Sequence, residues 1–393
     1  MNILIIFPEY ACKCLNTIIE NGFDAYFVGG CVRDSLLGRC CNDIDIATSA
    51  LPENIISMFE HTIPTGIKHG TVTVIIDGHN IEITTFRQEF GYKDSRHPDN
   101  IVFVPNLEDD LSRRDFTINA LASSKNGEII DMFGGLEDLS SGVIKAVGNP
   151  ENRFDEDALR IVRAFRFASM LGFKIERKTK IAAALLSKKI SKISGERIYS
   201  ELLKLASGIS PSAICELVNI GALKDFGIYR QKYDTNIIDR LSNVDISPVS
   251  KLAILLMFFE HDTDLIKKSL KTDNFLIAKI KSLETLLKAD IPNNKKQIKL
   301  LLSSHNIETI RLYFYFLNLV YNLTDNSLFE MLDEILKNNE AYYISHLKID
   351  GNDLIALGYR GSEIKTALNK CLISVINNDT ENTKESLLKF LQM

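Results

Sequence analysis

Hydrophobic and polar positions follow one period in the first part of the chain and another in the rest. Up to about residue 125, short apolar runs bounded by turn residues predict strands at residues 24–28, 43–47, 70–76 and 80–86. Asp77-Gly78 separates the last two runs and is typical of a tight hairpin, so those strands are expected to pair antiparallel. From about residue 150 to the end, apolar residues recur at helical spacing with few turn breakers.

The change of period predicts an α+β fold, in which a small head with a mixed or antiparallel sheet precedes an all-helical remainder. A chain of 393 residues is too long for one hydrophobic core and suggests two to four domains. Turn-rich breaks in the helical pattern divide the remainder further. The predicted parts are a head at residues 1–145, a neck at 146–205, a body at 206–285 and a tail at 286–393.

The composition is that of a globular protein without a membrane partner. Hydrophobic residues make up 45% of the chain and charged residues 25%, which is enough apolar material for ordinary cores. The sequence has no run of about 18 apolar residues, and Pro8 and Glu9 come too early for the core of a signal peptide. We therefore expect a soluble protein in the cytoplasm.

Seven cysteines contain no CxxC pair and have no histidines nearby at zinc spacing. They are Cys12, Cys14, Cys31, Cys40, Cys41, Cys215 and Cys371. Five of them fall in the first 41 residues, which raises the alternative of a metal or redox site. Reduced, mostly structural thiols are the expectation.

The net charge of -5 argues weakly against nucleic-acid binding until the charges are located along the chain. Between Lys145 and Lys204 there are fourteen Lys or Arg residues and seven Asp or Glu residues. This local excess of seven positive charges shows that a basic patch and an acidic average coexist in one chain.

Two aspartates on the second predicted strand, Asp43 and Asp45, are separated by one residue. Because side chains alternate along a strand, both point to one face while Ile44 and Ile46 point into the core. Two carboxylates about 6 to 7 Å apart repel each other unless a cation or basic groups lie near them. Oxygen ligands without His or Cys at matching spacing favour magnesium or manganese over zinc.

The turn VGGCVRD follows the first predicted strand and opens a helix. Gly29 and Gly30 let backbone N–H groups approach phosphate oxygens closely, and Arg33 adds a planar charged donor. Together with the two acids, this turn predicts a triphosphate site in which metal ions bridge the reacting phosphate and an attacking hydroxyl. The alternative is a tight turn beside an acidic surface strand.

Motifs between residue 26 and about residue 205 resemble those of the polymerase-beta nucleotidyltransferase superfamily, and within it the class II tRNA nucleotidyltransferases, the CCA-adding enzymes. They occur in family order as VGGCVRDSLLG, DIDIATSA, TIPTGIKHGTVTV, ITTFR, YKDSRHPD, DDLSRRDFTINALA, DMFGGLEDL, RFDEDALRIVRAFRFA and SGERIYSELLKL. The last fifty residues, around LKIDGNDLIALGY, are similar to the tail of bacterial members. Residues 210–340 carry no recognisable motif.

The resemblance implies that Asp43 and Asp45 are catalytic acids that bind Mg2+. It implies a further carboxylate in the same site, and Glu82 lies on a plausible neighbouring strand. A Glu on a surface strand is also common, so an ordinary surface role is the alternative for this residue.

In the stretch DLSRRDFTINALA the resemblance implies contacts to ribose and phosphate from Arg114 and Asp115, with Arg113 beside them. A carboxylate can accept a hydrogen bond from a ribose hydroxyl, which would favour ribonucleotides. Local salt bridges at a helix start are the alternative.

The stretch RFDEDALRIVRAFRFA is implied to read the incoming base. Asp157, Arg160, Arg163 and Arg166 recur every three residues and are expected to form a slanted row on a helix. Without the resemblance, such a row is typical of a solvent-exposed salt-bridge face. Arg163 and Arg166, further along the row, suit phosphates or the end of the tRNA.

Cytosine and adenine both present an exocyclic amine beside an unprotonated ring nitrogen. Asp157 can therefore accept from the amine while Arg160 donates to the ring nitrogen. Uracil and guanine reverse both groups. One protein pocket would thus select C and A without a nucleic-acid template.

The predicted activity is template-independent addition of CCA to tRNA 3' ends from CTP and ATP, with release of pyrophosphate. A-adding or CC-adding enzymes and, less closely, poly(A) polymerases are the alternatives; the loop EFGYKDSRHPDN, with Asp94 and Arg96, argues against a CC-adding enzyme. A non-catalytic RNA-binding module or a nucleotide sensor would be a different class of function. The helical tail is expected to bind tRNA by its backbone shape, and the oligomeric state stays open.

Overall fold

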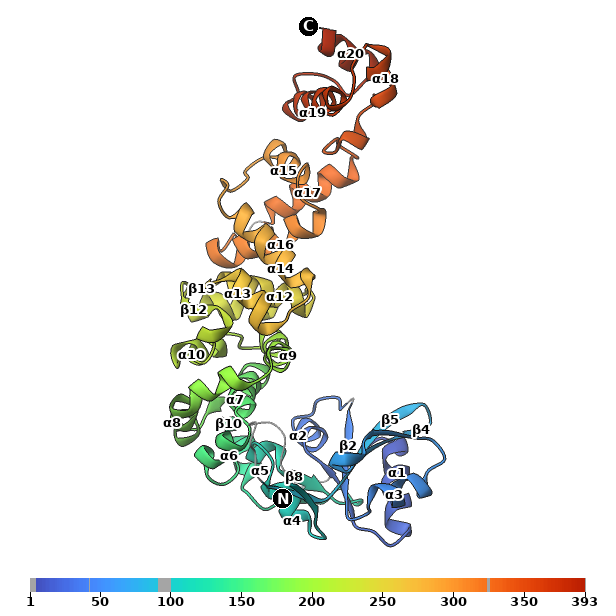
Figure 1. Ribbon diagram of the computed structural model, residues 1–393, viewed down its shortest axis with the longest axis vertical. Coiled ribbons are helices and arrows are strands. Elements are labelled where there is room, and N and C mark those ends of the chain that lie inside the picture. Colours follow the sequence, from blue (N-terminus) through green and yellow to red (C-terminus); the bar gives the residue numbers. More distant parts are fainter. Residues whose placement is uncertain (1–4, 42, 91–99, 324–325, 393) are drawn as a thin grey trace. The chain divides into compact units, whose positions relative to one another are not determined.

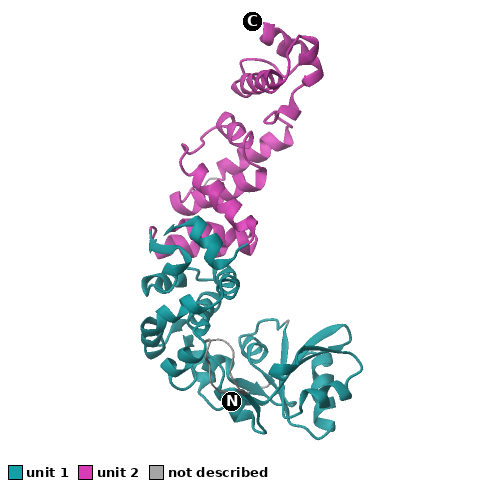
Figure 2. Ribbon diagram, in the orientation of Figure 1, with its two compact units in different colours: residues 1–231, 260–272 teal, residues 232–259, 273–393 magenta. Residues whose placement is uncertain are grey.

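The computed structural model describes residues 5–41, 43–90, 100–323 and 326–392. The chain divides into two compact units (Figure 2). Unit 1 comprises residues 1–231 and 260–272, and unit 2 comprises residues 232–259 and 273–393. The finer division into head, neck, body and tail rests on turn signals in the sequence and stays a prediction.

A seven-stranded mixed sheet forms the centre of the N-terminal part of unit 1 (Figure 1). Its strands lie in the order β3-β4-β5-β2-β1-β8-β9. β2 and β5 run parallel, and the other neighbours run antiparallel. The bounds are β1 (Ala25–Val28), β2 (Ile44–Thr48), β3 (Thr62–Gly66), β4 (Thr71–Ile76), β5 (His79–Thr85), β8 (Leu121–Ser123) and β9 (Ile129–Asp131). The predicted mixed sheet is confirmed.

β4 and β5 form the hairpin that the sequence predicts. Asp77 and Gly78 at its turn have φ angles of 51° and 80°, as a two-residue turn with the twist of the flanking strands requires. Helices α1 (Glu9–Glu20) and α3 (Pro52–Met58) pack against both strands and bury their alternate apolar residues. A separate two-stranded sheet consists of β6 (Arg87–Phe90) and β7 (Asn100–Phe103).

The other elements of unit 1 are mainly helices. They are α2 (Gly30–Leu36), α4 (Leu107–Ser112), η2 (Thr117–Asn119), α5 (Gly135–Ser140), α6 (Pro150–Glu156), α7 (Leu159–Leu171), α8 (Arg177–Leu186), η3 (Ser187–Lys192), α9 (Gly195–Ala206), α10 (Ala213–Asn219), η4 (Lys224–Phe226) and α13 (Thr263–Leu270). Short strands lie between them: β10 (Val143–Ile144), β11 (Lys174–Ile175), β12 (Ile228–Gln231) and β13 (Phe259–His261), the last of which begins in unit 2. The remainder of the chain is therefore largely helical, but "all-helical" was too strict, because β10 and β11 pair in parallel across α6 and α7.

Helix α7 occupies the centre of the helical part of unit 1. It packs on α9 and α10, and eleven of its 13 residues are buried. It ends at Gly172, whose left-handed conformation (φ 72°) lets its N–H donate to the Ala168 carbonyl. Arg160 and Arg166 on this helix are 9% and 6% exposed, so a solvent-exposed salt-bridge face is the wrong interpretation for them.

The predicted row of charged residues is divided between two elements. Helix α6 ends at Glu156, and Asp157 is extended (φ -140°, ψ 105°) before α7 begins. The Leu159 N–H donates to Asp157 Oδ1 at 3.0 Å, which satisfies an amide that a helix start leaves unpaired. The expectation of a single helical row is therefore wrong for Asp157. Because Asp157 lies between α6 and α7, the direction of its carboxylate is not set by the helix that carries the three arginines of the row.

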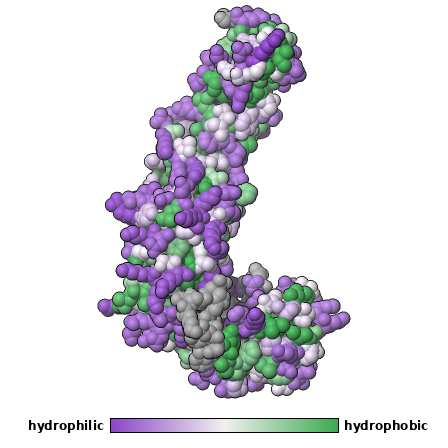
Figure 3. Space-filling model, in the orientation of Figure 1, coloured by the Kyte–Doolittle hydropathy of each residue, from purple (hydrophilic) through white to green (hydrophobic). Residues whose placement is uncertain are grey.

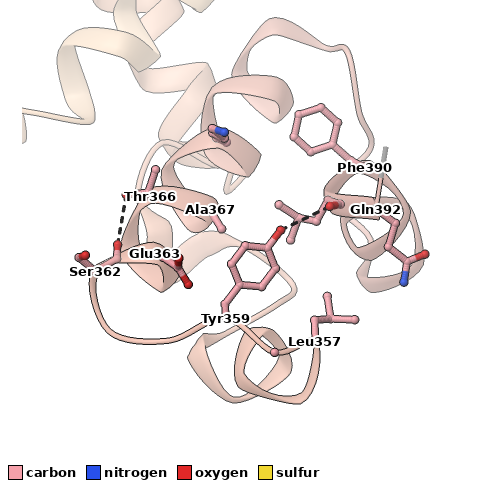
Figure 4. A pocket seen from close by; sticks show the side chains of 11 residues that line it. Leu357, Tyr359, Ser362, Glu363, Thr366, Ala367, Phe390 and Gln392 are labelled. Atoms are coloured by element: carbon pink, nitrogen blue, oxygen red, sulfur yellow. Dashed lines mark hydrogen bonds between the residues drawn. The ribbon is translucent and has the colours of Figure 1, made fainter.

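Within the described residues, unit 2 consists of helices apart from Phe259, the first residue of β13. They are α11 (Thr235–Asp239), η5 (Arg240–Asn243), α12 (Pro248–Met257), α14 (Asn274–Leu286), α15 (Lys295–Leu302), α16 (Ile307–Tyr321), α17 (Ser327–Lys337), η6 (Ile344–His346), α18 (Gly351–Ala356), α19 (Ser362–Asn377) and α20 (Lys384–Gln392). Leu354, Cys371, Ile376 and Leu387 belong to the core of its C-terminal helices. A cavity of about 890 Å³ lies among α18, α19 and α20 (Figure 4).

Hydrophilic side chains cover most of the face seen in Figure 3, with smaller hydrophobic patches between them. Within the described part of the chain, no helix combines the length and the apolar character that crossing a membrane requires.

Candidate active site

A cavity of about 720 Å³ in unit 1 brings together eleven of the twelve residues that the sequence predicts for the site. They are Gly29, Gly30, Arg33, Asp43, Asp45, Arg114, Asp115, Asp157, Arg160, Arg163 and Arg166. These residues come from the turn before α2 and α2 itself, from β2 and the residue before it, from the segment after α4 and from the segment between α6 and the middle of α7. Motifs far apart in the sequence thus meet in one cavity, and Glu82 is not among its lining residues.

Asp43 and Asp45 lie at the start of β2, as the strand alternation predicts. Ile44 and Ile46 are 2% and 1% exposed, whereas Asp43 is exposed and Asp45 half-buried. Burial raises the pKa of Asp45 to about 6; Arg114 opposes this rise, and the carboxylates of Glu82 and Asp43 add to it. Negative charge on this strand is therefore costly, and a cation would offset the cost.

Glu82 lies on β5, directly beside Asp45 in the parallel register of the two strands. Its side chain is exposed. Among the described residues, no group of three or more His, Cys, Asp or Glu side chains is arranged to hold a metal ion. The role of Glu82 as a third metal ligand therefore stays a prediction, and of the three acids proposed for the metal only Asp43 and Asp45 line the cavity.

The turn before α2 requires glycine at its first position. Gly29 has a φ of +73°, and a Cβ there would lie 2.8 Å from Nη1 of Arg114. At Gly30, the first residue of α2, a Cβ would meet Nη2 of Arg33 at 3.7 Å, an ordinary contact. The guanidinium of Arg114 thus lies directly against the backbone of this turn.

Arg33 is 7% exposed, and three hydrogen bonds fix its guanidinium group. Its Nε and Nη2 donate to Oδ1 and Oδ2 of Asp34 at 2.9 and 2.8 Å, and its Nη1 donates to Asn119 Oδ1 at 2.6 Å. The sequence reading missed both partners, although Asp34 directly follows Arg33. A paired, buried guanidinium keeps its direction, which suits the recognition of a phosphate.

Arg113 and Arg114 share one buried carboxylate. Asp110 on α4 is fully buried, and it accepts from Nε and Nη2 of Arg113 at 3.0 and 2.6 Å and from Nη2 of Arg114 at 3.1 Å. Burial raises the pKa of Asp110, but both arginines outweigh this and hold it below its usual value. The local salt bridges that were the alternative reading do form, and both arginines line the cavity as well.

Asp115 is 8% exposed, and both its oxygens accept hydrogen bonds from the chain itself. Arg163 donates to Oδ2 from Nε at 2.8 Å and from Nη2 at 2.6 Å, and Asn119 donates to Oδ1 at 3.0 Å. Burial would raise the pKa of Asp115, but Arg163 and Asn119 outweigh it and hold this pKa well below its usual value. The carboxylate thus orients Arg163 from a distant segment of the sequence.

The two residues expected to read the base are each fixed by a partner. Asp157 Oδ2 accepts from Nη2 of Arg197 on α9 at 2.8 Å. Arg160 donates from Nη1 to Glu156 Oε2 at 2.6 Å and from Nη2 to the Arg113 carbonyl at 3.1 Å. Both side chains line the cavity, and their partners set the direction of each.

Helix α9 also holds the other two arginines of the row. Glu201 is 6% exposed, and its Oε2 lies 2.9 Å from Nε of Arg166 while its Oε1 lies 3.9 Å from Nη1 of Arg163. Burial and the charge of Arg163 lower the pKa of Arg166 to about 10. Arg197 and Glu201 are four residues apart in SGERIYSELLKL, which is the spacing of one helix face and could have revealed them.

Phe167 presents its ring to three guanidinium groups. Their central carbons lie 3.8 Å (Arg166), 5.1 Å (Arg33) and 5.4 Å (Arg163) from the ring centre. Contacts of this kind are attractive because the face of the ring is electron-rich. The sequence analysis did not single out Phe167, which lines the cavity.

Comparisons with known proteins agree along the whole chain. Residues 25–145 match the poly A polymerase head domain, residues 172–226 the probable RNA and SrmB-binding site of polymerase A, and residues 248–391 a putative tRNA nucleotidyltransferase domain 2. The CCA-adding enzyme of Lactobacillus delbrueckii subsp. bulgaricus is 39% identical, over 97% of this chain and 96% of that enzyme. The chain belongs to the CCA-adding enzymes.

Other CCA-adding enzymes support this assignment. The enzyme of Lactobacillus helveticus is 37% identical over 97% of this chain and 96% of its own length. The structure of the Bacillus stearothermophilus CCA-adding enzyme in complex with CTP has a TM-score of 0.81 and 32% identity, with 98% of each chain covered. That of the Thermotoga maritima CCA-adding enzyme complexed with tRNA has a TM-score of 0.71 and 24% identity, which shows the fold.

These findings confirm the family and the fold that the motifs predicted, and this CCA-adding enzyme is a tRNA nucleotidyltransferase. The role of each cavity residue stays a prediction. Asp94 and Arg96, which the sequence reading used against a CC-adding enzyme, lie outside the described residues.

Proposed function

We propose that this protein adds CCA to the 3' ends of tRNA, transferring CMP from CTP and AMP from ATP to the terminal 3' hydroxyl and releasing pyrophosphate. The observation that carries the proposal is the single cavity in which the acids of β2 meet the charged residues of α6 and α7. The acids of β2 suit phosphoryl transfer, and the charged residues of α6 and α7 suit recognition of a base. The relatives, which are CCA-adding enzymes over nearly their full length, support it.

The triphosphate is held by the turn before α2 and by two arginines. The backbone N–H of Gly30 can approach a phosphate oxygen, because neither glycine of the turn carries a side chain, whereas the N–H of Gly29 donates to the Leu121 carbonyl at 3.1 Å. Arg33, fixed by Asp34 and Asn119, donates in a constant direction. Arg114 lies against the same turn, and its Nε is buried without a hydrogen-bond partner among the described residues. A phosphate oxygen would satisfy it.

Asp43 and Asp45 would hold Mg2+ at the reacting phosphate. The donor set fits this ion, since it consists of carboxylate oxygens, and magnesium is commonly held by one or two carboxylates together with substrate phosphates and water. When bound, the ion lowers the pKa of the attacking hydroxyl and stabilises the charge on the leaving pyrophosphate. The chain then needs no nucleophile of its own, and its residues bind and align the two substrates.

Base selection rests on Asp157 and Arg160. The carboxylate accepts from the exocyclic amine of C or A, and the guanidinium donates to the adjacent ring nitrogen. Uracil or guanine would leave the base-facing atom of each group without its hydrogen bond to the base, at about 1 to 3 kcal/mol for each. Arg197 and Glu156 keep the two readers from turning to fit the wrong base.

The tRNA is the second substrate. The stretch from Lys145 to Lys204, with its excess of positive charge, lies beside the cavity and suits the acceptor end. We assign catalysis to residues 1–145, base recognition to 146–205 and contacts with the tRNA backbone to the helices that follow, chiefly 286–393. We place the protein in the cytoplasm, where tRNA and ribonucleotides are.

One experiment tests the activity directly. Purified protein is given three tRNAs that end at the discriminator base, at C and at CC, each with one labelled ribonucleotide and Mg2+. We expect all three to be extended to CCA, with CTP and ATP used and UTP and GTP refused. Extension of the CC-ended tRNA alone would make the protein an A-adding enzyme and contradict the proposal.

A further inference from the structure

Cys31 and Cys41 come together beside the two acids of β2. The Cys31 thiol, in the first turn of α2, contacts the carbonyl oxygen of Val28 at 3.1 Å and that of Asp45 at 3.7 Å. The Cys41 thiol contacts the carbonyl oxygen of Asp43 at 3.2 Å. The carbonyls of Asp43 and Asp45 that the thiols contact are two residues apart in the chain, and the interaction between the two side chains raises the pKa of Cys31 and lowers that of Cys41. Nine residues lie between them in the sequence, a spacing that alone indicates no pairing.

The two thiols differ in their access to solvent. Cys31 is 1% exposed, while Cys41 is half-buried and borders the active-site cavity. Cys41 also lines a second hollow, together with residues that include Ile6, Leu36 and Arg39. A small oxidant can therefore meet Cys41, with Cys31 already in contact behind it.

We propose that Cys31 and Cys41 are a redox modification site, which a peroxide converts to a disulfide that reversibly switches off nucleotide incorporation at the adjoining acids. The five cysteines near the N-terminus, for which the sequence favoured a structural role, thus contain a functional pair. The inference rests on the proposed function only for its activity readout.

The chemistry requires two thiols and one peroxide. The Cys41 sulfur attacks the O–O bond, so that an S–O bond forms, the O–O bond breaks and one water leaves with the thiol proton. The Cys31 sulfur then displaces the hydroxyl from the Cys41 sulfur, which forms the S–S bond and releases a second water. The two sulfurs together lose two electrons, and hydrogen peroxide gains them.

The disulfide changes the backbone on which the catalytic acids stand. An S–S bond of about 2.0 Å is shorter than any contact between two thiols, so Cys41, two residues from Asp43, must be drawn toward Cys31. The disulfide has no S–H group, and neither Asp43 nor Asp45 keeps a thiol contact at its carbonyl. A displacement of about 1 Å at reacting groups can lower a rate on the order of 100-fold.

The test uses the full-length protein, treated with hydrogen peroxide and then digested without reduction. Mass spectrometry is expected to find the Cys31–Cys41 cross-link, and CMP incorporation into tRNA is expected to fall at least tenfold and to return with dithiothreitol. Absence of this cross-link, a different pairing such as Cys31 with Cys40, or full activity in the cross-linked protein would each overturn the proposal. The cross-link is measured by mass, so its result stands even if the reduced protein incorporates no nucleotide.

Two substitutions complete the test. Cys41→Ser is expected to keep its incorporation rate in peroxide, whereas wild type loses it. Cys40→Ser removes the neighbouring exposed thiol and is the matched control, which should remain as sensitive as wild type. Equal inactivation of Cys41→Ser and wild type would show that the damage occurs elsewhere. If Cys41→Ser folds poorly, the presence or absence of the Cys31–Cys41 disulfide in peroxide-treated wild type still tests the proposal.

Discussion

The cavity in unit 1 and the cavity at the C-terminal end of unit 2 differ in chemistry far more than in size. Their volumes are about 720 and 890 Å³. The first is lined mainly by charged residues. The second is lined by apolar and uncharged residues such as Tyr359 and Phe390, and its charged lining residues are Glu363 and Lys370 (Figure 4). The larger hollow is thus the less polar one.

Hydrogen bonding separates the two cavities further. In the C-terminal cavity the Tyr359 hydroxyl donates to the Leu391 carbonyl, as Figure 4 shows. In the unit 1 cavity, Nε of Arg114 and Nη1 of Arg197 are buried without a partner among the described residues. Such a group costs about 1 to 3 kcal/mol, which an anionic ligand can recover. Buried N–H donors without a partner, rather than volume, therefore distinguish the candidate active site.

The same change of carboxylate to amide in each cavity gives the sharpest test. Asp45→Asn removes a proposed metal ligand worth several kcal/mol in the transition state, so CMP incorporation should fall on the order of 1000-fold or more. Glu363→Gln should stay within about twofold of wild type, because its cavity has no proposed part in the chemistry. Circular dichroism should show both variants folded. Retained turnover in folded Asp45→Asn would refute the metal assignment.

Asp115→Asn tests how much the buried ion pairs of the unit 1 cavity stabilise the fold. Removing one partner of a buried ion pair should lower the free energy of unfolding by ~3 kcal/mol. Urea unfolding at pH 7 measures this loss. The folded pKa of Asp115 is depressed, so its stabilisation is present above the unfolded value of about 3.9 and is lost as the pH falls below it. The difference in free energy of unfolding between the variant and the wild type should therefore become smaller at acidic pH.

The control for this change is an exposed pair of the same chemistry. Asp155 pairs with Lys189, and its side chain is 60% exposed. Asp155→Asn should lower the free energy of unfolding by less than about 1 kcal/mol. An equal cost for both substitutions would mean that burial of the cavity pairs contributes nothing.

Gly29→Ala tests the close approach of Arg114 to the turn. The new methyl group would meet a guanidinium nitrogen at 2.8 Å on a backbone with positive φ, and the displaced arginine should lower kcat on the order of 100-fold. Gly30→Ala, where the corresponding contact is 3.7 Å, should cost less. Steady-state kinetics with CTP measures both, and the reverse order of losses would contradict the assigned geometry.

Asp157→Asn tests base selection without removing phosphate contacts. An amide can donate as well as accept, so the preference for CTP over UTP should fall by about tenfold, as the loss of roughly 1.4 kcal/mol predicts. The measurement is the ratio of kcat/KM for the two nucleotides. A lower rate with an unchanged ratio would mean that Asp157 supports the cavity but does not read the base.

Tyr359→Phe should have the smallest effect. It removes one hydroxyl that donates to Leu391 at 3.4 Å, worth about 0.5 to 1.5 kcal/mol at most. Thermal unfolding should shift slightly, and CMP incorporation should stay at the wild-type rate. A large loss of incorporation would show that the C-terminal cavity takes part in the reaction and would remove the contrast between the two cavities.

Local sequence patterns predicted the strands of the N-terminal part of the protein correctly. Alternation along β2 predicted that Asp43 and Asp45 share a face, and the dipeptide Asp77-Gly78 predicted the hairpin, because both depend on neighbours in the sequence. The period of three from Asp157 to Arg166 was a less reliable guide. It matches one helix face, yet the chain breaks at Asp157, where an extended residue and a new helix start give the same spacing.

Local sequence patterns could not predict which residues from distant segments contact the site residues. Asn119 beside Arg33, Arg197 beside Asp157 and the two thiols at Cys31 and Cys41 meet because helices pack on the sheet and on each other. The burial of Arg160 has the same origin, since its helix is enclosed by others. Spacing along the chain shows which residues share a face, and packing shows what that face meets.

Three guanidinium groups around the single ring of Phe167 have a consequence for the whole catalytic cycle. Each is paired with a carboxylate of the chain, and a nucleotide bound as proposed would add further negative charge beside them. Charges that would speed the capture of a nucleotide would then also slow the release of pyrophosphate. We expect turnover to pass through an optimum as salt is raised, where capture and departure are equally fast.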